Sequence, residues 1–125
     1  MIQRIQTLLI LILSLLSLTT FYFSYEVQSK SIVNNIYLFL FVAIASFINI
    51  FLFHYRLVQA RICLMLYFVF ISIIAYYFIY LLNGIKLEPT YFHISSSFIQ
   101  LVLAFFARKA ILKDEDLIRS VDRIR

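Results

Sequence analysis

Charge is missing from four long stretches of this 125-residue chain. Residues 5–25, 31–55, 62–85 and 89–107 contain no Asp, Glu, Lys or Arg. A helix needs about 20 apolar residues to cross the hydrocarbon layer, and each stretch has that length or nearly so. Ionisable groups inside a membrane usually mark proton or ion paths. Their absence argues against a proton-coupled exporter and against an ion channel lined by charged rings.

Glycine, proline and cysteine occur only once each. Transporter sites are often built from membrane helices that Gly or Pro interrupts, but Gly84 and Pro89 lie where the third stretch ends and the fourth begins. We therefore expect unbroken helices, with Gly84 capping the third and Pro89 in the first turn of the fourth. The single Cys63 excludes an internal disulfide and dithiol exchange chemistry.

What the chain has in abundance is apolar residues. Hydrophobic residues make up 64% of it, and the mean hydropathy is +0.98. A soluble domain this small could not bury so much apolar surface. The apolar runs are continuous rather than alternating, which favours helices over a barrel. The sequence thus predicts an all-α integral membrane four-helix bundle, with spans near residues 5–25, 33–54, 62–82 and 90–107 and a tail over residues 108–125.

The basic residues indicate the orientation of the spans. With the N-terminus inside, only Lys30 and Lys86 of the eleven Lys and Arg residues face outward, and Glu26 and Glu88 balance them. The formal net charge of +5 then lies on the cytoplasmic side, as the positive-inside rule requires. We expect both termini in the cytoplasm. The first span lacks a small-residue cleavage site, so we expect a retained signal anchor.

Tyrosines gather near the predicted outer boundary, where their amphipathic rings prefer the headgroup zone. One interpretation is an aromatic belt, and the other is a rim that holds a lipid-like ligand or a neighbouring subunit. These outer tyrosines are Tyr22, Tyr25, Tyr37, Tyr76, Tyr77, Tyr80 and Tyr91.

Two amide side chains, Asn49 and Gln100, lie inside the spans. Their depths below the inner boundary are about 8 and 12 Å, so the side chains can meet if the second and fourth helices touch. Ser46 lies one turn from Asn49, and small residues allow helices to approach closely. We expect an interhelical polar contact among Asn49, Gln100 and Ser46. The alternative is a contact with another subunit or a bound headgroup.

Residues for catalysis or metal binding do not come together in the sequence. His54 and His93 fall at opposite membrane boundaries, too far apart to share a metal or a haem. We find no nucleophile–base pair, no Gly-rich phosphate loop and no metal-ligand spacing. The basic residues are interspersed with acids near the membrane, unlike a nucleic-acid surface. We expect no enzyme activity, no cofactor, no metal and no nucleic-acid partner.

The tail differs from the spans because it is charged and amphipathic. Leu117, Ile118, Val121 and Ile124 follow helical spacing, so the tail can extend the fourth helix. It can lie on the inner leaflet or present a docking stripe to a partner. The candidate docking residues are Arg108, Lys109, Leu117, Ile118, Arg119, Val121, Asp122, Arg123 and Ile124.

The two ends of the chain carry its most specific residues. They read MIQRIQT over residues 1–7, ARKAI over 107–111 and DEDLIRSVDRIR over 114–125. These ends resemble those of an uncharacterised family of small bacterial membrane proteins, known only as a domain of unknown function with four predicted spans. The resemblance implies a bacterial inner-membrane protein. It brings no known activity, ligand or catalytic residue.

Chargeless spans, unbroken helices and distinctive ends together predict a non-catalytic structural or accessory subunit of a larger inner-membrane complex. Its tail and lipid-facing helices would contact membrane lipids and other membrane-protein subunits. The alternative is a lipid- or quinone-binding protein, or a self-associating pore, that uses the outer tyrosines with Asn49 and Gln100.

Overall fold

The computed structural model describes residues 2–27, 36–84 and 89–124, and these residues form an all-α fold, as predicted. The four helices are α1 (Ile2–Val27), α2 (Ile36–Phe51), α3 (Arg56–Leu82) and α4 (Pro89–Ile124). A 3-10 turn, η2 (Leu52–His54), and Tyr55 join α2 to α3. The part of the predicted second span that precedes Ile36 lies outside the described residues.

Each helix is long and apolar enough to cross a membrane. The apolar segments are Ile5–Glu26, Tyr37–His54, Arg56–Leu82 and Thr90–Val121. Large hydrophobic side chains also cover the outside of the bundle, where Phe41, Phe51 and Met65 are each about two-thirds exposed. A water-soluble surface avoids such apolar patches, whereas a hydrocarbon environment favours them. These are the features of a multi-pass membrane protein.

The helix ends follow the local signals in the sequence. Gly84 has a φ of +75°, the left-handed conformation that favours glycine after a helix. The backbone N–H groups of Asn83 and Gly84 donate to the carbonyls of Ile79 and Leu81, both at 3.1 Å. Pro89 begins α4, where its missing N–H costs nothing. The predicted caps are confirmed.

The connection between α2 and α3 is shorter than expected. The spans predicted near residues 33–54 and 62–82 leave residues 55–61 between them, but α3 already begins at Arg56. The reason is that a charged residue ends an apolar stretch without ending a helix, since arginine can extend its side chain toward the headgroups. Gln59 and Ala60 are buried in this first part of α3.

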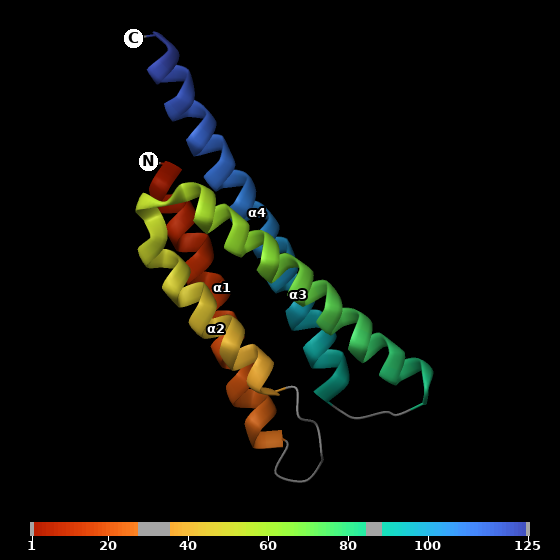
Figure 1. The fold of residues 1–125 in the computed structure, drawn as a ribbon. Coiled ribbons are helices and arrows are strands. Elements are labelled where there is room, and N and C mark those ends of the chain that lie inside the picture. Colours follow the sequence, from red (N-terminus) through yellow and green to blue (C-terminus); the bar gives the residue numbers. More distant parts are fainter. Residues whose placement is uncertain (1, 28–35, 85–88, 125) are drawn as a thin grey trace.

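The helices pack in the order α2, α1, α4, α3, so that α1 and α4 form the central pair (Figure 1). We call the end with the α2–α3 connection the corner end, and the end with Gly84 and Pro89 the loop end. α2 and α3 meet mainly near the corner end and diverge toward the loop end (Figure 1). α4 continues beyond the other helices at the corner end (Figure 1).

Buried side chains repeat every three or four residues along the central pair. This is the spacing that keeps one helix face against a neighbour in a left-handed bundle. Many of these side chains are small or polar, which allows a close approach between membrane helices. The repeating positions are Gln6, Ile10, Leu13, Ser17, Thr20 and Ser24 in α1, and His93, Ser97, Gln100, Ala104, Ala107 and Ile111 in α4.

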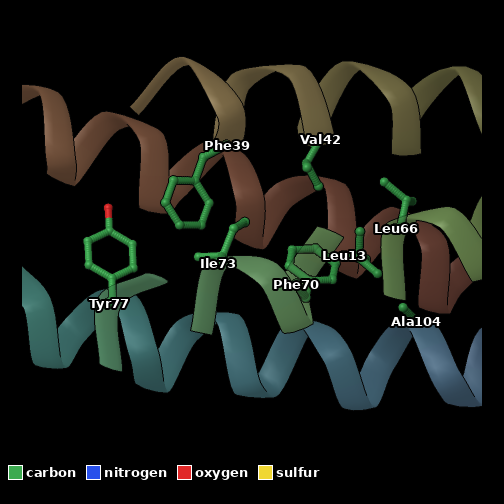
Figure 2. Close-up of a cluster of buried hydrophobic side chains, with 8 residues drawn as sticks. All are labelled: Leu13, Phe39, Val42, Leu66, Phe70, Ile73, Tyr77 and Ala104. Atoms are coloured by element: carbon green, nitrogen blue, oxygen red, sulfur yellow. The ribbon is translucent and has the colours of Figure 1, made fainter. Parts of the chain in front are cut away.

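Apolar side chains from all four helices fill the middle of the bundle (Figure 2). Phe39 and Phe70 are the largest of the fully buried side chains. A second, smaller apolar cluster lies nearer the corner end. The main cluster consists of Leu13, Phe39, Val42, Leu66, Phe70, Ile73, Tyr77 and Ala104, and the smaller one of Ile10, Ala60, Cys63, Ala107 and Ile111.

Candidate functional site

The predicted contact between Asn49 and Gln100 is wrong, because α2 and α4 are not neighbours. Along the described residues, their Cα atoms do not approach within 8 Å. The amide nitrogen of Asn49 instead donates to the thiol sulfur of Cys63 in α3, at 3.3 Å. Its amide oxygen is buried and has no hydrogen-bond partner within residues 2–27, 36–84 and 89–124. Ser46, the third residue of the predicted contact, donates to the carbonyl of Val42 within α2.

Gln100 joins α4 to α1. Its amide oxygen accepts a hydrogen bond from the Ser17 hydroxyl at 3.2 Å, and its amide nitrogen donates to the Thr20 hydroxyl at 3.4 Å. Both polar atoms of this buried amide group therefore form hydrogen bonds. The predicted role of Gln100 as an interhelical polar contact holds, but with α1 as the partner.

His93 is buried inside the loop end of the bundle, although its sequence position suggested a membrane boundary. Only 4% of this residue is exposed. The Ser24 hydroxyl of α1 lies 3.3 Å from its Nε2 atom. Its ring stacks on Tyr77 at 4.9 Å and on Phe39 at 5.4 Å between ring centroids. The repeat of Ser17, Thr20 and Ser24 in α1 was the signal that could have revealed this burial.

A groove opens between α2 and α3 in the part of the bundle where these helices diverge. Its volume is about 260 Å³. Phe39 and Tyr77, the two rings that stack on His93, belong to its wall. The Tyr77 hydroxyl is buried and has no hydrogen-bond partner in the part of the chain that the structure describes. We call this the α2–α3 groove, and its lining residues are Leu38, Phe39, Val69, Ser72, Ile73, Tyr76 and Tyr77.

The predicted outer tyrosines differ widely in exposure, and Tyr76 and Tyr80 lie between the extremes. Tyr22, Tyr25, Tyr37 and Tyr91 are all more than 60% exposed, as a headgroup belt would be. Tyr77 is only 5% exposed and turns into the bundle. Figure 2 shows its hydroxyl pointing away from α4, beside Phe39. The tyrosines therefore do not act as one uniform collar.

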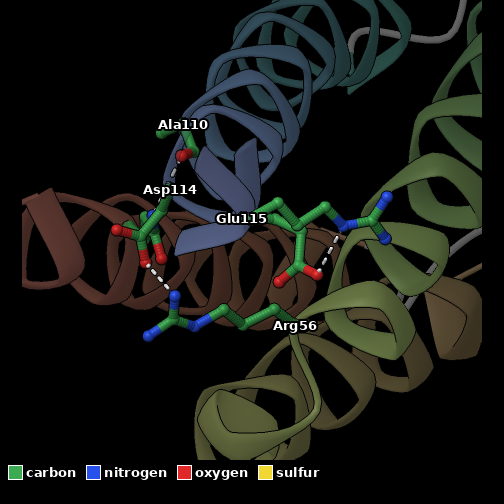
Figure 3. Close-up of polar contacts among 6 residues, drawn as sticks. Arg56, Ala110, Asp114 and Glu115 are labelled. Atoms are coloured by element: carbon green, nitrogen blue, oxygen red, sulfur yellow. Dashed lines mark hydrogen bonds and ion pairs between the residues drawn. The ribbon is translucent and has the colours of Figure 1, made fainter. Parts of the chain in front are cut away.

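Polar contacts tie α4 to its neighbours at the corner end. Arg56 at the start of α3 forms a 2.9 Å ion pair with Asp114 of α4 (Figure 3). The Gln6 amide of α1 donates to the carbonyl of Ala110, also at 2.9 Å. These contacts mark the level at which α1 and α3 begin, and α4 continues past it.

A hollow of about 340 Å³ lies beside this ion pair, between the α2–α3 connection and α4. Its apolar wall residues are Phe53 and Ile118, and His54, Arg56 and Glu115 complete it. We call it the corner hollow. Glu115 also pairs with Arg119 one turn further along α4, at 3.2 Å (Figure 3).

The predicted tail is the last part of α4 and is helical to Ile124. Leu117, Ile118 and Val121 are exposed by 45%, 39% and 60%, so their apolar stripe is uncovered. Arg108 is half-buried, and Lys109 is exposed. The side chains of Asp122, Arg123 and Ile124 lie outside the described residues.

Among the described residues, no three or more His, Cys, Asp or Glu side chains gather where they could hold a metal ion. The α2–α3 groove and the corner hollow, two of the hollows among these residues, differ in character. One is apolar and lies between diverging helices, and the other is flanked by charges.

The family model described as Domain of unknown function (DUF4293) matches residues 24–124. This match confirms the resemblance to a family of unknown function, although it does not reach the opening MIQRIQT residues. No curated protein and no solved structure matches the chain.

Proposed function

This chain belongs to the DUF4293 family of unknown function, and we propose that it is a non-catalytic accessory subunit of a larger membrane complex. The observation that carries this proposal is the last part of α4. It extends past the bundle and exposes Leu117, Ile118 and Val121 beside the corner hollow.

The length of α4 favours docking over an arrangement in which the tail lies on the leaflet. With 36 residues, α4 is about 54 Å long, against about 30 Å for the hydrocarbon layer. Leu117 and Val121 lie about 15 and 21 Å beyond Ala107 along the helix axis. The headgroup layer is only about 5–8 Å deep on each side. A helix that leaves the membrane without a bend carries these apolar side chains into water, where a partner can cover them.

The corner hollow indicates what kind of partner fits. Phe53 and Ile118 offer apolar walls, while Arg56 and Glu115 bring opposite charges to the same rim. An amphipathic helix suits this arrangement, since its apolar face fills the hollow and its polar residues pair at the rim. The proposed occupant is therefore an amphipathic helix of another subunit.

The proposed location is the bacterial inner membrane, with both termini and the corner end in the cytoplasm. Arg56 and Arg61 of α3 and Arg108, Lys109 and Lys113 of α4 all belong to the corner half of their helices. Basic residues next to membrane spans are retained on the cytoplasmic side. The partner helix would then be cytoplasmic or lie at the inner membrane surface.

Photo-crosslinking in intact cells tests the docking proposal. A photoreactive amino acid at Phe53 is expected to give one discrete protein adduct. Ile118→Asp should abolish this adduct because it places a charge on the facing wall of the hollow. Asp116→Asn, two residues away on exposed helix surface, should leave it intact.

The alternatives give different products in the same experiment. Lipid adducts alone would favour a tail that lies on the leaflet, and an adduct of twice the chain mass would indicate self-association. Either result would contradict docking to a different subunit. A lipid- or quinone-binding role depends on a separate surface, the α2–α3 groove.

A further inference from the structure

The α2–α3 groove combines an apolar wall with a buried polar atom that no described residue satisfies. Its residues are aliphatic or aromatic apart from Ser72, whose hydroxyl donates to the carbonyl of Phe68 in its own helix. Tyr77 is only 5% exposed, and its hydroxyl has no hydrogen-bond partner among the described residues. Burying a hydroxyl without a partner is unfavourable, and such groups in native proteins call for an explanation.

A phenylalanine at position 77 would fill the same space without this cost. The Tyr77 ring is held in place from behind, because it stacks on His93, which in turn contacts Ser24 and Phe39. The Tyr77 ring therefore has a defined position in the groove wall, which also fixes the position of its buried hydroxyl. A rigid donor in an apolar groove is the typical arrangement of a small-molecule site, in which few polar groups orient a largely apolar ligand.

We propose that the α2–α3 groove binds a membrane lipid whose apolar chain lies between α2 and α3 and whose carbonyl oxygen accepts a hydrogen bond from Tyr77. Two kinds of molecule carry this chemistry in a bacterial membrane. One is an isoprenoid quinone with its ring carbonyls, and the other is a phospholipid with its ester carbonyls.

The size and opening of the groove agree with a ligand of this kind. Its volume of about 260 Å³ is slightly below the range of about 300–1,000 Å³ for pockets that enclose a whole ligand. The groove therefore holds the ring or the upper part of a chain, and the remainder stays in the bilayer. Such a ligand enters sideways from the hydrocarbon layer, between the diverging helices.

This proposal does not depend on partner docking. The groove lies toward the loop end between α2 and α3, whereas docking uses the corner hollow and the end of α4. Variants in one surface leave the other unchanged, so either proposal can fail alone.

Binding can be measured with the full chain, purified in detergent and depleted of lipid. The probes are a naphthoquinone with a short isoprenyl tail, dioleoyl phosphatidylglycerol, and squalene as an isoprenoid without a carbonyl. We expect the first or the second to raise the melting temperature in a saturable way. We also expect an infrared shift of the carbonyl band of the bound probe to lower frequency, as hydrogen bonding requires. Squalene should bind more weakly than either.

Two substitutions test the two parts of the site. Tyr77→Phe removes only the donor and should weaken binding about three- to tenfold and abolish the infrared shift. Ser72→Phe should block the groove from its exposed edge and abolish binding. The matched controls, Tyr67→Phe on the same helix and Ser95→Phe at an exposed serine of α4, should bind like the wild type.

The outcomes separate the two ligand sources and can refute the site. If only the naphthoquinone or only the phosphatidylglycerol binds in a saturable way, the ligand is a quinone or a phospholipid, respectively. Failure of both probes, or squalene binding as tightly as they do, overturns the proposal, as does unchanged binding by Tyr77→Phe. Without ligand, Tyr77→Phe should melt no lower than the wild type, because the lost hydroxyl was unsatisfied. A marked loss of stability would show that the hydroxyl serves the fold rather than a ligand.

Discussion

Buried polar side chains in this bundle differ in how completely they are satisfied. Gln100 uses both its amide oxygen and its amide nitrogen in contacts with α1. Within the described residues, Asn49 donates only to a thiol, a weak acceptor, and its oxygen has no partner. An interhelical hydrogen bond inside a membrane contributes about 0.6–2 kcal/mol, while an unsatisfied buried acceptor costs about 1–3 kcal/mol. The two amides should therefore affect stability in opposite ways.

We predict that Gln100→Leu lowers the free energy of unfolding by about 1–2 kcal/mol. Asn49→Leu should change it by less than about 0.5 kcal/mol or raise it, because the substitution removes an unsatisfied acceptor. The double variant should equal the sum of the single effects, since the side chains do not touch. Denaturation in detergent, followed by circular dichroism, measures all three. A coupling energy above about 1 kcal/mol would mean that the two amides interact.

Among the helices, α4 joins α1 to α3. It packs along both α1 and α3, and at the corner end its Asp114 pairs with Arg56 while its Ala110 carbonyl accepts from Gln6. The two charged side chains of the ion pair are 21% and 15% exposed. Partial burial screens this pair less than a surface pair, so it should contribute near the upper end of the surface range.

We predict that Asp114→Asn lowers the free energy of unfolding by about 1 kcal/mol. The control Asp116→Asn removes the same charge from an exposed position and should have little effect. Exchanging the charges, as Arg56→Asp with Asp114→Arg, should recover most of the loss. Denaturation at low and high salt measures these differences, and high salt should reduce the effect of Asp114→Asn. Equal losses from Asp114→Asn and Asp116→Asn would show that the pair contributes nothing specific.

At the scale of the whole molecule, apolar surface extends over the helices, and charge concentrates at the corner end. Membrane insertion and orientation therefore depend on different residues. The apolar spans drive insertion through their length, and the basic residues at the corner end determine which side they face. The single cysteine of the chain, Cys63, is only 2% exposed. The unmodified chain should therefore react weakly with thiol reagents, which makes it a suitable control for cysteine labelling.

We predict that Val121→Cys, at the end of α4, reacts with a membrane-impermeant maleimide only after the inner membrane is permeabilised. Asn83→Cys, at the loop end, should react in cells whose inner membrane is intact. The expected cause is the excess of basic residues at the corner end. The unmodified chain serves as the control and should label weakly. Labelling of Val121→Cys in intact cells would reverse the proposed orientation.

The helices themselves follow from local properties of the sequence. Their apolar length, the glycine cap at Gly84, the proline that begins α4 and the amphipathic continuation to Ile124 are all decided within a few residues of each position. Neighbouring helices are not needed to explain them, because in lipid each backbone must satisfy its own hydrogen bonds. For this reason the all-α fold and the uninterrupted fourth helix could be predicted.

Which helices become neighbours was decided only by tertiary packing. A span that is apolar on every side has no amphipathic face to show which side turns inward. The expected pairing of Asn49 with Gln100 failed for this reason, and the stacking of His93 on Tyr77 could not be foreseen. The repeat of small and polar residues in α1 and α4 does indicate a close contact, but their partners depend on how whole helices fit together. The sequence by itself therefore determined the helices and their ends. The tertiary structure alone decided the α2–α3 groove and the corner hollow, because both depend on which helices lie side by side.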